Sequence, residues 1–255
     1  MAKLKAALLF LAVAATAHAD WTIAAATTEG SRVGVQRRHV VLEDAETSES
    51  ATVDLALFST KSCTLRVIDQ PTPPPNDLAH VMAQENCLAG VNGGYFDPDY
   101  APIGLLISDG KIIAPLQRAR LLTGVLSVSP RDVRILRVRE FSRQQKLDAA
   151  IQCGPFLVDQ GQHVRGLEET RAARRTFAAV DGVDRAALGF CSEVSLSNLA
   201  KVLAALRLAE NFKIQRALNL DGGSSSAFWF ARENGTVYSI PEQKTVRDFV
   251  GVVPR

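Results

Sequence analysis

Two short segments carry residue types that suit the binding of an anion. Residues 91–97 read Val-Asn-Gly-Gly-Tyr-Phe-Asp, and residues 218–226 read Leu-Asn-Leu-Asp-Gly-Gly-Ser-Ser-Ser. In each, a short apolar stretch leads an Asn or Asp into a glycine pair. Paired glycines permit positive φ and let backbone N–H groups face a ligand without a Cβ in the way. Such groups suit a phosphate, and the hydroxyls of Ser224, Ser225 and Ser226 could add donors.

The simpler explanation of each segment is a tight hairpin turn, since Asn-Gly and Asp-Gly are the commonest hairpin signals. One such segment alone would be explained that way, but two flanked by apolar stretches favour a shared functional cleft. Arg175 adds a third indication, because it directly precedes the apolar stretch 176–180. An inward-pointing arginine at that place is costly without an anionic partner.

Other chemistries have little support. The sequence lacks a G-x-S-x-G elbow, a Walker loop and a G-x-G-x-x-G turn. His39, His80 and His163 are isolated and lack the spacing of metal ligands. We therefore predict no metal and no cofactor.

Hydrophobic patterning predicts many short strands and few helices. A helix is expected from Asp77 to about Asn86, and a second, with a stripe from Leu196 to Leu206, begins after Ser195. The expected strands are 53–58, 65–68, 88–91, 105–107, 111–113, 121–128, 133–138, 156–158, 164, 176–180, 185–190, 217–220, 227–230, 237–240 and 249–253. Without regular βαβ alternation, this favours an α+β fold: one domain of mixed, strand-rich sheets with two or three packed helices.

Composition excludes several classes of protein. The 255 residues are 47% hydrophobic and 22% charged, which is ordinary for a globular domain and excludes a disordered chain. The formal net charge of +2 is too balanced for an electrostatic nucleic-acid binder. We expect no nucleic-acid partner and no stable membrane insertion. The oligomeric state is left open.

Residues 1–19 have the pattern of a secretory signal peptide. Lys3 and Lys5 precede an apolar run too short to span a bilayer, and Ala17-His18-Ala19 forms a small-x-small cleavage site. We predict an exported protein, periplasmic or secreted and of bacterial type, whose functional domain covers residues 20–255. Export to an oxidising compartment would also allow the four cysteines to form two disulfides. Of three possible pairings, nearness in sequence favours Cys63–Cys87 and Cys153–Cys191.

An ordered set of motifs resembles the phosphodiester glycosidase family. The motifs are Asn92-Gly93-Gly94-Tyr95-Phe96, Gly154-Pro155-Phe156-Leu157, Arg175-Thr176 and Asn219-Leu220-Asp221-Gly222-Gly223-Ser224, with Arg247 before the last apolar strand. The resemblance runs from about Cys87 to Val253. It implies a hydrolase that splits a glycosyl phosphodiester into free sugar and phosphomonoester. For an exported protein, we expect the substrates to be envelope or exopolysaccharide glycans.

The resemblance also implies roles for these residues. Asp221 would be the catalytic carboxylate, either as nucleophile or as the base that activates water. Arg175 would bind the phosphate as a permanently charged fork. Asn92, counted with the catalytic residues, and Asn219 would orient sugar or phosphate oxygens. The further substrate-binding candidates are Gly93, Gly94, Gly154, Thr176, Gly222, Gly223, Ser224 and Asp97, although 97–99 could equally be a solvated turn.

Two alternatives remain open at this stage. One is a non-catalytic module that binds phosphorylated glycans with the same residues. The other is a serine hydrolase that uses Ser224, Ser225 or Ser226, although no base partner is recognisable in the sequence.

Overall fold

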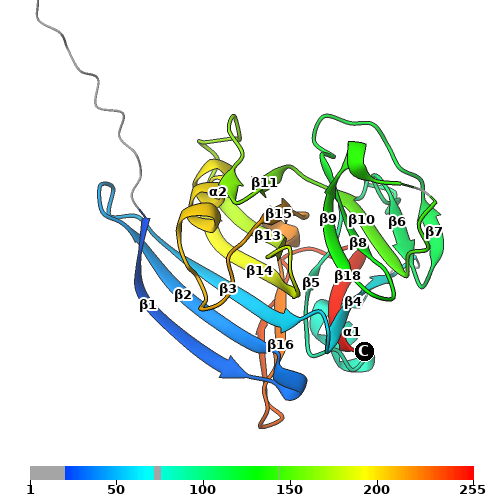
Figure 1. The fold of residues 1–255 in the computed structure, drawn as a ribbon, viewed down its shortest axis with the longest axis horizontal. Coiled ribbons are helices and arrows are strands. Elements are labelled where there is room, and N and C mark those ends of the chain that lie inside the picture. Colours follow the sequence, from blue (N-terminus) through cyan, green and yellow to red (C-terminus); the bar gives the residue numbers. More distant parts are fainter. Residues whose placement is uncertain (1–20, 72–75, 143) are drawn as a thin grey trace, which may run out of the picture.

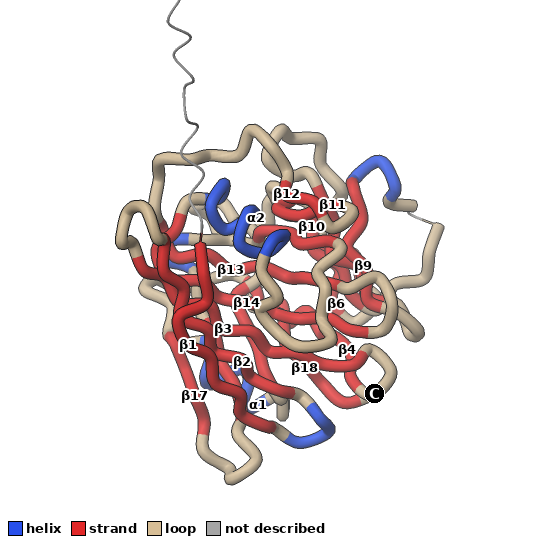
Figure 2. Tube along the Cα trace, turned by 60° about the vertical axis from the view of Figure 1, so that its left-hand side comes forward, coloured by secondary structure: helices blue, strands red, loops and turns tan. Residues whose placement is uncertain are grey.

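The fold comes from a computed structural model that describes residues 21–71, 76–142 and 144–255. Three antiparallel sheets surround one apolar core, and the helices lie outside them (Figures 1 and 2). The signal-peptide prediction for residues 1–19 falls outside the described residues. Among the described residues, no helix has both the length and the apolar character needed to cross a membrane.

The largest sheet has eight strands in the order β1-β2-β3-β14-β13-β15-β11-β12. Its members are β1 (Trp21–Gly30), β2 (Gln36–Asp44), β3 (Ser50–Ser59), β14 (Arg185–Val194), β13 (Ala173–Val180), β15 (Arg216–Asn219), β11 (Phe156–Asp159) and β12 (Gln162–His163). Helix α2 (Leu196–Ala205) packs on its outer face. As predicted, Ser195 begins this helix, because its side chain accepts the Asn198 N–H at 3.1 Å.

Two five-stranded sheets enclose the rest of the core. One is β17-β16-β5-β18-β4 and the other β7-β6-β10-β8-β9. The strands are β17 (Val237–Ile240), β16 (Phe228–Ala231), β5 (Ala89–Asn92), β18 (Asp248–Pro254), β4 (Cys63–Asp69), β7 (Lys111–Ala114), β6 (Leu106–Ser108), β10 (Ala149–Cys153), β8 (Gly124–Val128) and β9 (Val133–Arg137). Helix α1 (Leu78–Gln84) covers the outer face of the first. Short 3-10 turns stand at η1 (Arg32–Gly34), η2 (Val138–Glu140) and η3 (Gly223–Ser225).

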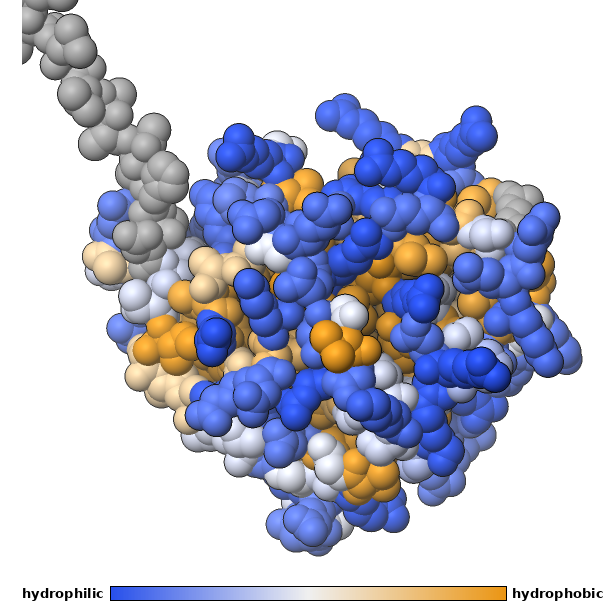
Figure 3. Space-filling view, viewed as in Figure 1, coloured by the Kyte–Doolittle hydropathy of each residue, from blue (hydrophilic) through white to orange (hydrophobic). Residues whose placement is uncertain are grey.

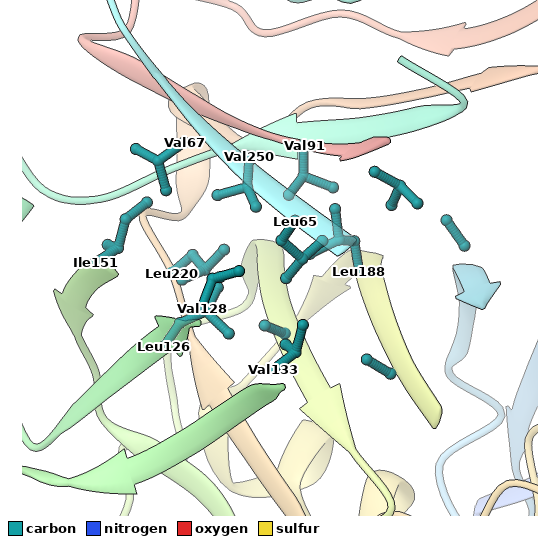
Figure 4. Close-up of a cluster of buried hydrophobic side chains, with 14 of the residues drawn as sticks. Leu65, Val67, Val91, Leu126, Val128, Val133, Ile151, Leu188, Leu220 and Val250 are labelled. Carbon is teal, nitrogen blue, oxygen red and sulfur yellow. The ribbon is translucent and has the colours of Figure 1, made fainter. Parts of the chain in front are cut away.

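The central core receives side chains from all three sheets. Figure 4 shows Leu188 from the eight-stranded sheet facing Val91 and Val250 from one small sheet and Leu126 and Val128 from the other. Alternate residues of the strands that line this core point into it. The intervening residues face outward, toward α2 on the large sheet and toward α1 on the sheet of β5. The surface seen in Figure 3 is mostly polar, with small apolar patches.

The positions of the four cysteines contradict the predicted disulfides. All four cysteines are buried free thiols. Cys63 and Cys153 point into the central core, whereas Cys87 lies beneath α1 and Cys191 beneath α2. A sheet therefore stands between the members of each predicted pair, and nearness in sequence could not reveal on which face each thiol lies.

The fold is strand-rich with two α-helices in the described part of the chain, which agrees with the α+β prediction in its coarse form. Three strands were missing from that prediction: β1, β2 and β10. The first two lie at the open edge of the large sheet, and β10 is a continuous buried run that shows no alternation.

Candidate active site

The two glycine segments meet where the eight-stranded sheet joins the sheet of β5. Asn92 ends β5 and Asn219 ends β15, so both glycine turns leave neighbouring strand ends. The Asp221 amide donates to the Gly93 carbonyl at 3.0 Å. The two turns are thus directly bonded, as the shared-cleft prediction requires, although they are 129 positions apart at Asn92 and Asp221.

Asn92 joins these loops to each other from within the protein. Its Nδ2 donates to the Asp221 carbonyl at 2.8 Å, while its Oδ1 accepts the Thr176 hydroxyl at 2.7 Å and the Ala227 amide at 3.1 Å. Asn92 and Thr176 are both fully buried. Neither side chain can contact a substrate in this conformation, so the predicted catalytic role of Asn92 and the binding role of Thr176 become positioning roles.

The amides of Gly93 and Gly94 are also used internally. Gly93 N–H donates to the Asp248 carbonyl at 2.9 Å, and Gly94 N–H donates to Asp248 Oδ1 at 2.8 Å. A Cβ on Gly93 would lie 1.9 Å from that carboxylate oxygen. The pair is glycine because a buried carboxyl packs against it, and the predicted anion cradle does not form on this side.

The second glycine turn is open. Gly223 has φ +64°, and nothing lies within 4 Å of the position that its Cβ would take. Gly222 N–H donates to Asp221 Oδ1 at 2.9 Å. Within the described residues, the amides of Gly223 and Ser224 have no hydrogen-bond acceptor. These two donors begin the 3-10 turn η3 and are free to meet an anion.

Arg175 lies against this open turn. Its guanidinium is held by Nε to the Val194 carbonyl at 3.0 Å and by Nη2 to the Arg171 carbonyl at 2.7 Å. Its Nη1 would be 4.0 Å from a Cβ on Gly222. The side chain is buried, and Glu168 approaches only to 3.7 Å. Burial lowers the pKa of Arg175. The ordinary pKa of an arginine is so high that the guanidinium still stays charged.

Asp221 sits at the start of the open turn, one residue before Gly222, which the Arg175 side chain approaches. Burial raises the pKa of its carboxyl; Ser225, the Lys244 ammonium and the Gly222 amide act in the opposite direction. The result is a half-buried carboxyl on the turn that Arg175 approaches at Gly222. A carboxyl so placed can act as a nucleophile or base when ionised.

Asn219 forms a second buried connection with two further elements. Its Nδ2 donates to the Gly154 carbonyl at 3.0 Å and lies 3.2 Å from the Tyr95 hydroxyl. Tyr95 in turn donates to the Gly154 carbonyl at 2.5 Å. Gly154 thus contributes its carbonyl to the protein's own network. Asn219 Oδ1 is buried and has no donor among the residues that the structure describes, so this side chain still has one acceptor unused.

Asp97 serves its own loop. Its Oδ1 accepts the amides of Asp99 and Ala101, each at 2.9 Å. This is the turn interpretation that the sequence left open, and it replaces the predicted substrate contact. Arg247 is likewise structural, since it forms a two-bond pair with Asp69 at 2.7 and 3.1 Å.

The serine cluster does not supply an accessible nucleophile at two of its three positions. Ser225 and Ser226 are fully buried. Only Ser224 is partly exposed, and its carbonyl accepts the Gln243 and Lys244 amides. This weighs against the serine hydrolase alternative.

Two cavities of about 820 and 360 Å³ open elsewhere, among the turns that include Thr60, Asp132 and Asp184. They lie at the Val180 end of β13, the opposite end from Arg175, and contain none of the predicted site residues. The described residues contain no cluster of three or more His, Cys, Asp or Glu side chains that could hold a metal ion.

A family model described as phosphodiester glycosidase matches residues 85–253, which span both glycine turns, Arg175 and Asp248. The chain belongs to the phosphodiester glycosidase family. The uncharacterised protein YigE of Escherichia coli is 32% identical over 91 residues, which cover 33% of this chain and 36% of that protein. The match spans about a third of that relative.

Three solved structures share the fold. A protein from Synechocystis has a TM-score of 0.63 at 16% identity, over 91% of this chain and 64% of that one. The second is the catalytic domain of zebrafish N-acetylglucosamine-1-phosphodiester alpha-N-acetylglucosaminidase, auto-inhibited by its pro-peptide. Its TM-score is 0.61 at 17% identity, over 94% of this chain and 85% of that one. A protein from Burkholderia pseudomallei has a TM-score of 0.56 at 14% identity, over 82% of this chain and 75% of that one.

Sequence reasoning missed three participants. Asp248 follows Arg247 at the start of an apolar strand, and nothing in the pattern distinguishes it from a surface turn residue. Tyr95 was quoted in a motif but given no role. Lys244 lies in a polar stretch without a local signal. Each makes at least one contact with a residue more than 50 positions away: Asp248 with Gly94, Tyr95 with Gly154 and Lys244 with Phe96.

Proposed function

We propose that this protein hydrolyses a glycosyl phosphodiester to free sugar and a phosphomonoester, acting on envelope or exopolysaccharide glycans. Membership of the phosphodiester glycosidase family supports the reaction class. The single observation that carries the proposal is the placement of Arg175 and Asp221 against the same open glycine turn. A charged phosphate and the carbon that it leaves require this combination of a cation and a carboxylate.

Arg175 binds the phosphate in this proposal. Nε and Nη2 are held by backbone carbonyls, which leaves Nη1 directed toward Gly222 as the donor for the ligand. The free amides of Gly223 and Ser224 add donors from the turn itself. A guanidinium fixed in this way loses little conformational entropy when it binds an anion.

Asp221 acts at the anomeric carbon, as nucleophile or as the base for water. The transition state resembles an oxocarbenium ion, which a nearby carboxylate stabilises. A phosphate is already a good leaving group, so a strong general acid is not needed. Because burial raises the pKa of Asp221 and the ionised form is the reactive one, turnover should increase as pH rises through that pKa.

The alternative is a binding module without turnover. The carboxyl of Asp221 argues against it, because an ionised carboxylate beside a phosphate repels the ligand and would weaken a site built only for binding. A catalytic site tolerates that repulsion, since the carboxylate acts on the carbon rather than on the phosphate.

Hydrolysis of a panel of sugar-1-phosphodiesters, followed by release of free sugar, tests the function. Asp221→Asn should reduce turnover by about 1000-fold while binding of a non-hydrolysable phosphonate analogue stays nearly intact. Arg175→Lys keeps the charge but loses the bonds to the Val194 and Arg171 carbonyls that fix the donor, so both turnover and phosphonate binding should weaken. Turnover near the wild-type value in Asp221→Asn would remove that residue from catalysis.

Export is part of the same proposal, since such glycans lie outside the cytoplasm. Cleavage after Ala19 would leave Asp20-Trp21-Thr22 as the mature N-terminus. N-terminal sequencing of protein from its native host checks this, and an intact Met1 in a cytoplasmic fraction would contradict it.

A further inference from the structure

Lys244 stands at the other end of the open turn from Arg175. The amides of Gln243 and Lys244 both donate to the Ser224 carbonyl, at 2.7 and 3.3 Å. The Lys244 ammonium lies 5.3 Å from the centre of the Phe96 ring. Its positive charge is also one of the influences that lower the pKa of Asp221. Arg175 thus approaches the Gly222 end of the turn, and Lys244 the Ser224 end.

The segment that carries Lys244 is firmly held. Arg174 donates to the Pro241 carbonyl at 2.7 Å, and Glu242 accepts the Leu78 amide at 2.9 Å. The Arg247–Asp69 pair fixes the far end. The Lys244 side chain itself is exposed, and within the described residues it has no carboxylate within salt-bridge distance. Its backbone is therefore placed by neighbours while its charge remains available to a ligand.

Building on the function proposed above, we propose that Lys244 is a catalytic residue that stabilises the second negative charge of the departing phosphate. The bond from the anomeric carbon to the phosphate oxygen breaks, and its electron pair stays on that oxygen. The oxygen of water takes its place on the carbon, and the proton released by water is taken up by Asp221 or passed to solvent.

The charges on the phosphate explain why two cations are present. The diester group carries one negative charge, and the phosphomonoester formed from it carries up to two near neutral pH. Arg175 balances the charge that the substrate already has. Lys244 balances the charge that develops as the bond breaks, and an interaction that strengthens in the transition state raises kcat rather than affinity for the substrate.

Phe96 fixes the place of this ammonium. A cation over an aromatic face is attracted electrostatically, and the ring comes from the loop after β5, which the Gly93–Asp221 hydrogen bond ties to the open turn. The competing explanation is that Lys244 only packs on Phe96 and is otherwise solvated. In that case removal of its charge would leave catalysis and phosphate binding unchanged.

The experiment compares wild type with Lys244→Met, Lys244→Arg and a control, Lys213→Met, on an exposed lysine outside the site. We expect Lys244→Met to lower kcat by about 10- to 100-fold, with KM changed by less than about threefold. Its affinity for inorganic phosphate, measured by calorimetry, should fall about fivefold or more. Lys244→Arg should retain most of the wild-type kcat and phosphate affinity, and Lys213→Met should match wild type in both quantities.

Lys244 contacts Ser224 only through its main chain, so the variants should unfold at wild-type temperatures. Wild-type kcat and phosphate affinity in Lys244→Met would overturn the inference while the proposed function stands. If wild type cleaves no glycosyl phosphodiester, the proposed function fails. The phosphate titration then decides alone: equal affinity in wild type and Lys244→Met, or no phosphate binding at all, overturns the role of Lys244.

Discussion

The two glycine turns look alike in sequence and do opposite things in the fold. Gly93 and Gly94 give their amides to the buried carboxyl and carbonyl of Asp248. In the other turn, Arg175 approaches Gly222, and Gly223 borders open space; among the described residues the amides of Gly223 and Ser224 have no acceptor. The first turn, called the bracing turn below, holds two sheets together, and the second leaves its donors available to a ligand. A glycine pair after a buried strand therefore marks a close backbone approach, but the approaching group can be the protein's own side chain or a ligand.

The largest effect on stability should come from Asn92→Ala, on the bracing side. The substitution removes the bonds to the Asp221 carbonyl, the Thr176 hydroxyl and the Ala227 amide, all deeply placed. Leaving such groups unpaired should lower the free energy of unfolding by about 3 kcal/mol or more. Asp221→Asn, in the open turn, should change the free energy of unfolding by less than about 1 kcal/mol. Urea unfolding of both variants checks the contrast, and equal losses would break it.

A smaller difference in the free energy of unfolding should separate alanine substitutions at Gly93 and Gly223. A Cβ on Gly93 would overlap Asp248 Oδ1, whereas a Cβ on Gly223 would meet nothing within 4 Å. Gly93→Ala should cost about 2–3 kcal/mol through overpacking. Gly223→Ala carries only the strain of a positive φ, about 1–2 kcal/mol. The same unfolding measurement applies, and a larger loss in Gly223→Ala would contradict the assignment of the two turns.

The bracing carboxyl should also give stability a pH dependence. Burial raises the pKa of Asp248 from its ordinary 3.8 to about 7; the Gly94 amide and Arg247 lower it, whereas Asp69 and Asp221 raise it further. Between these values the unfolded chain loses the proton that the folded protein keeps. Stability should therefore fall as pH rises from about 4 to 7.

Asp248→Asn stays neutral throughout, so its melting temperature should fall less than that of wild type over the same pH range. Melting curves at pH 4.5 and 7.5 for both proteins measure this, with Asp99→Asn as a control on an exposed loop. Parallel declines in wild type and Asp248→Asn would show that the carboxyl does not titrate in this window.

The smallest effect should come from Asp97→Asn. The Asp97 side chain accepts two amides of its own loop, and an asparagine oxygen can accept the same bonds. Turnover on a glycosyl phosphodiester should stay within about twofold of wild type. A loss of tenfold or more would restore Asp97 as a substrate contact and would extend the open site to the bracing turn.

Much of the local structure could be read from the sequence because it depends on near neighbours. The α2 helix has a serine cap and an apolar stripe within eleven residues, and the hairpin at 105–113 has its own turn signal. The strands β1, β2 and β10 escaped prediction, since an edge ribbon and a fully buried run lack the alternation that marks a half-buried strand. The motif residues of the site were also legible, because their types and order are local facts.

Only the tertiary structure decided what each of those residues does. Cys63, in β4, and Cys87, in the segment between α1 and β5, lie on opposite faces of one sheet, which no spacing along the chain reveals. Asp248 reaches Gly94 across 154 positions and thereby uses up the amides that the sequence had assigned to a ligand. Hydrogen bonds and charges act over a few ångströms in space. The sequence by itself therefore determined the residue types and the local periodicity. Which glycine turn braces the fold and which one faces a ligand was decided only by the contacts formed where the sheets meet.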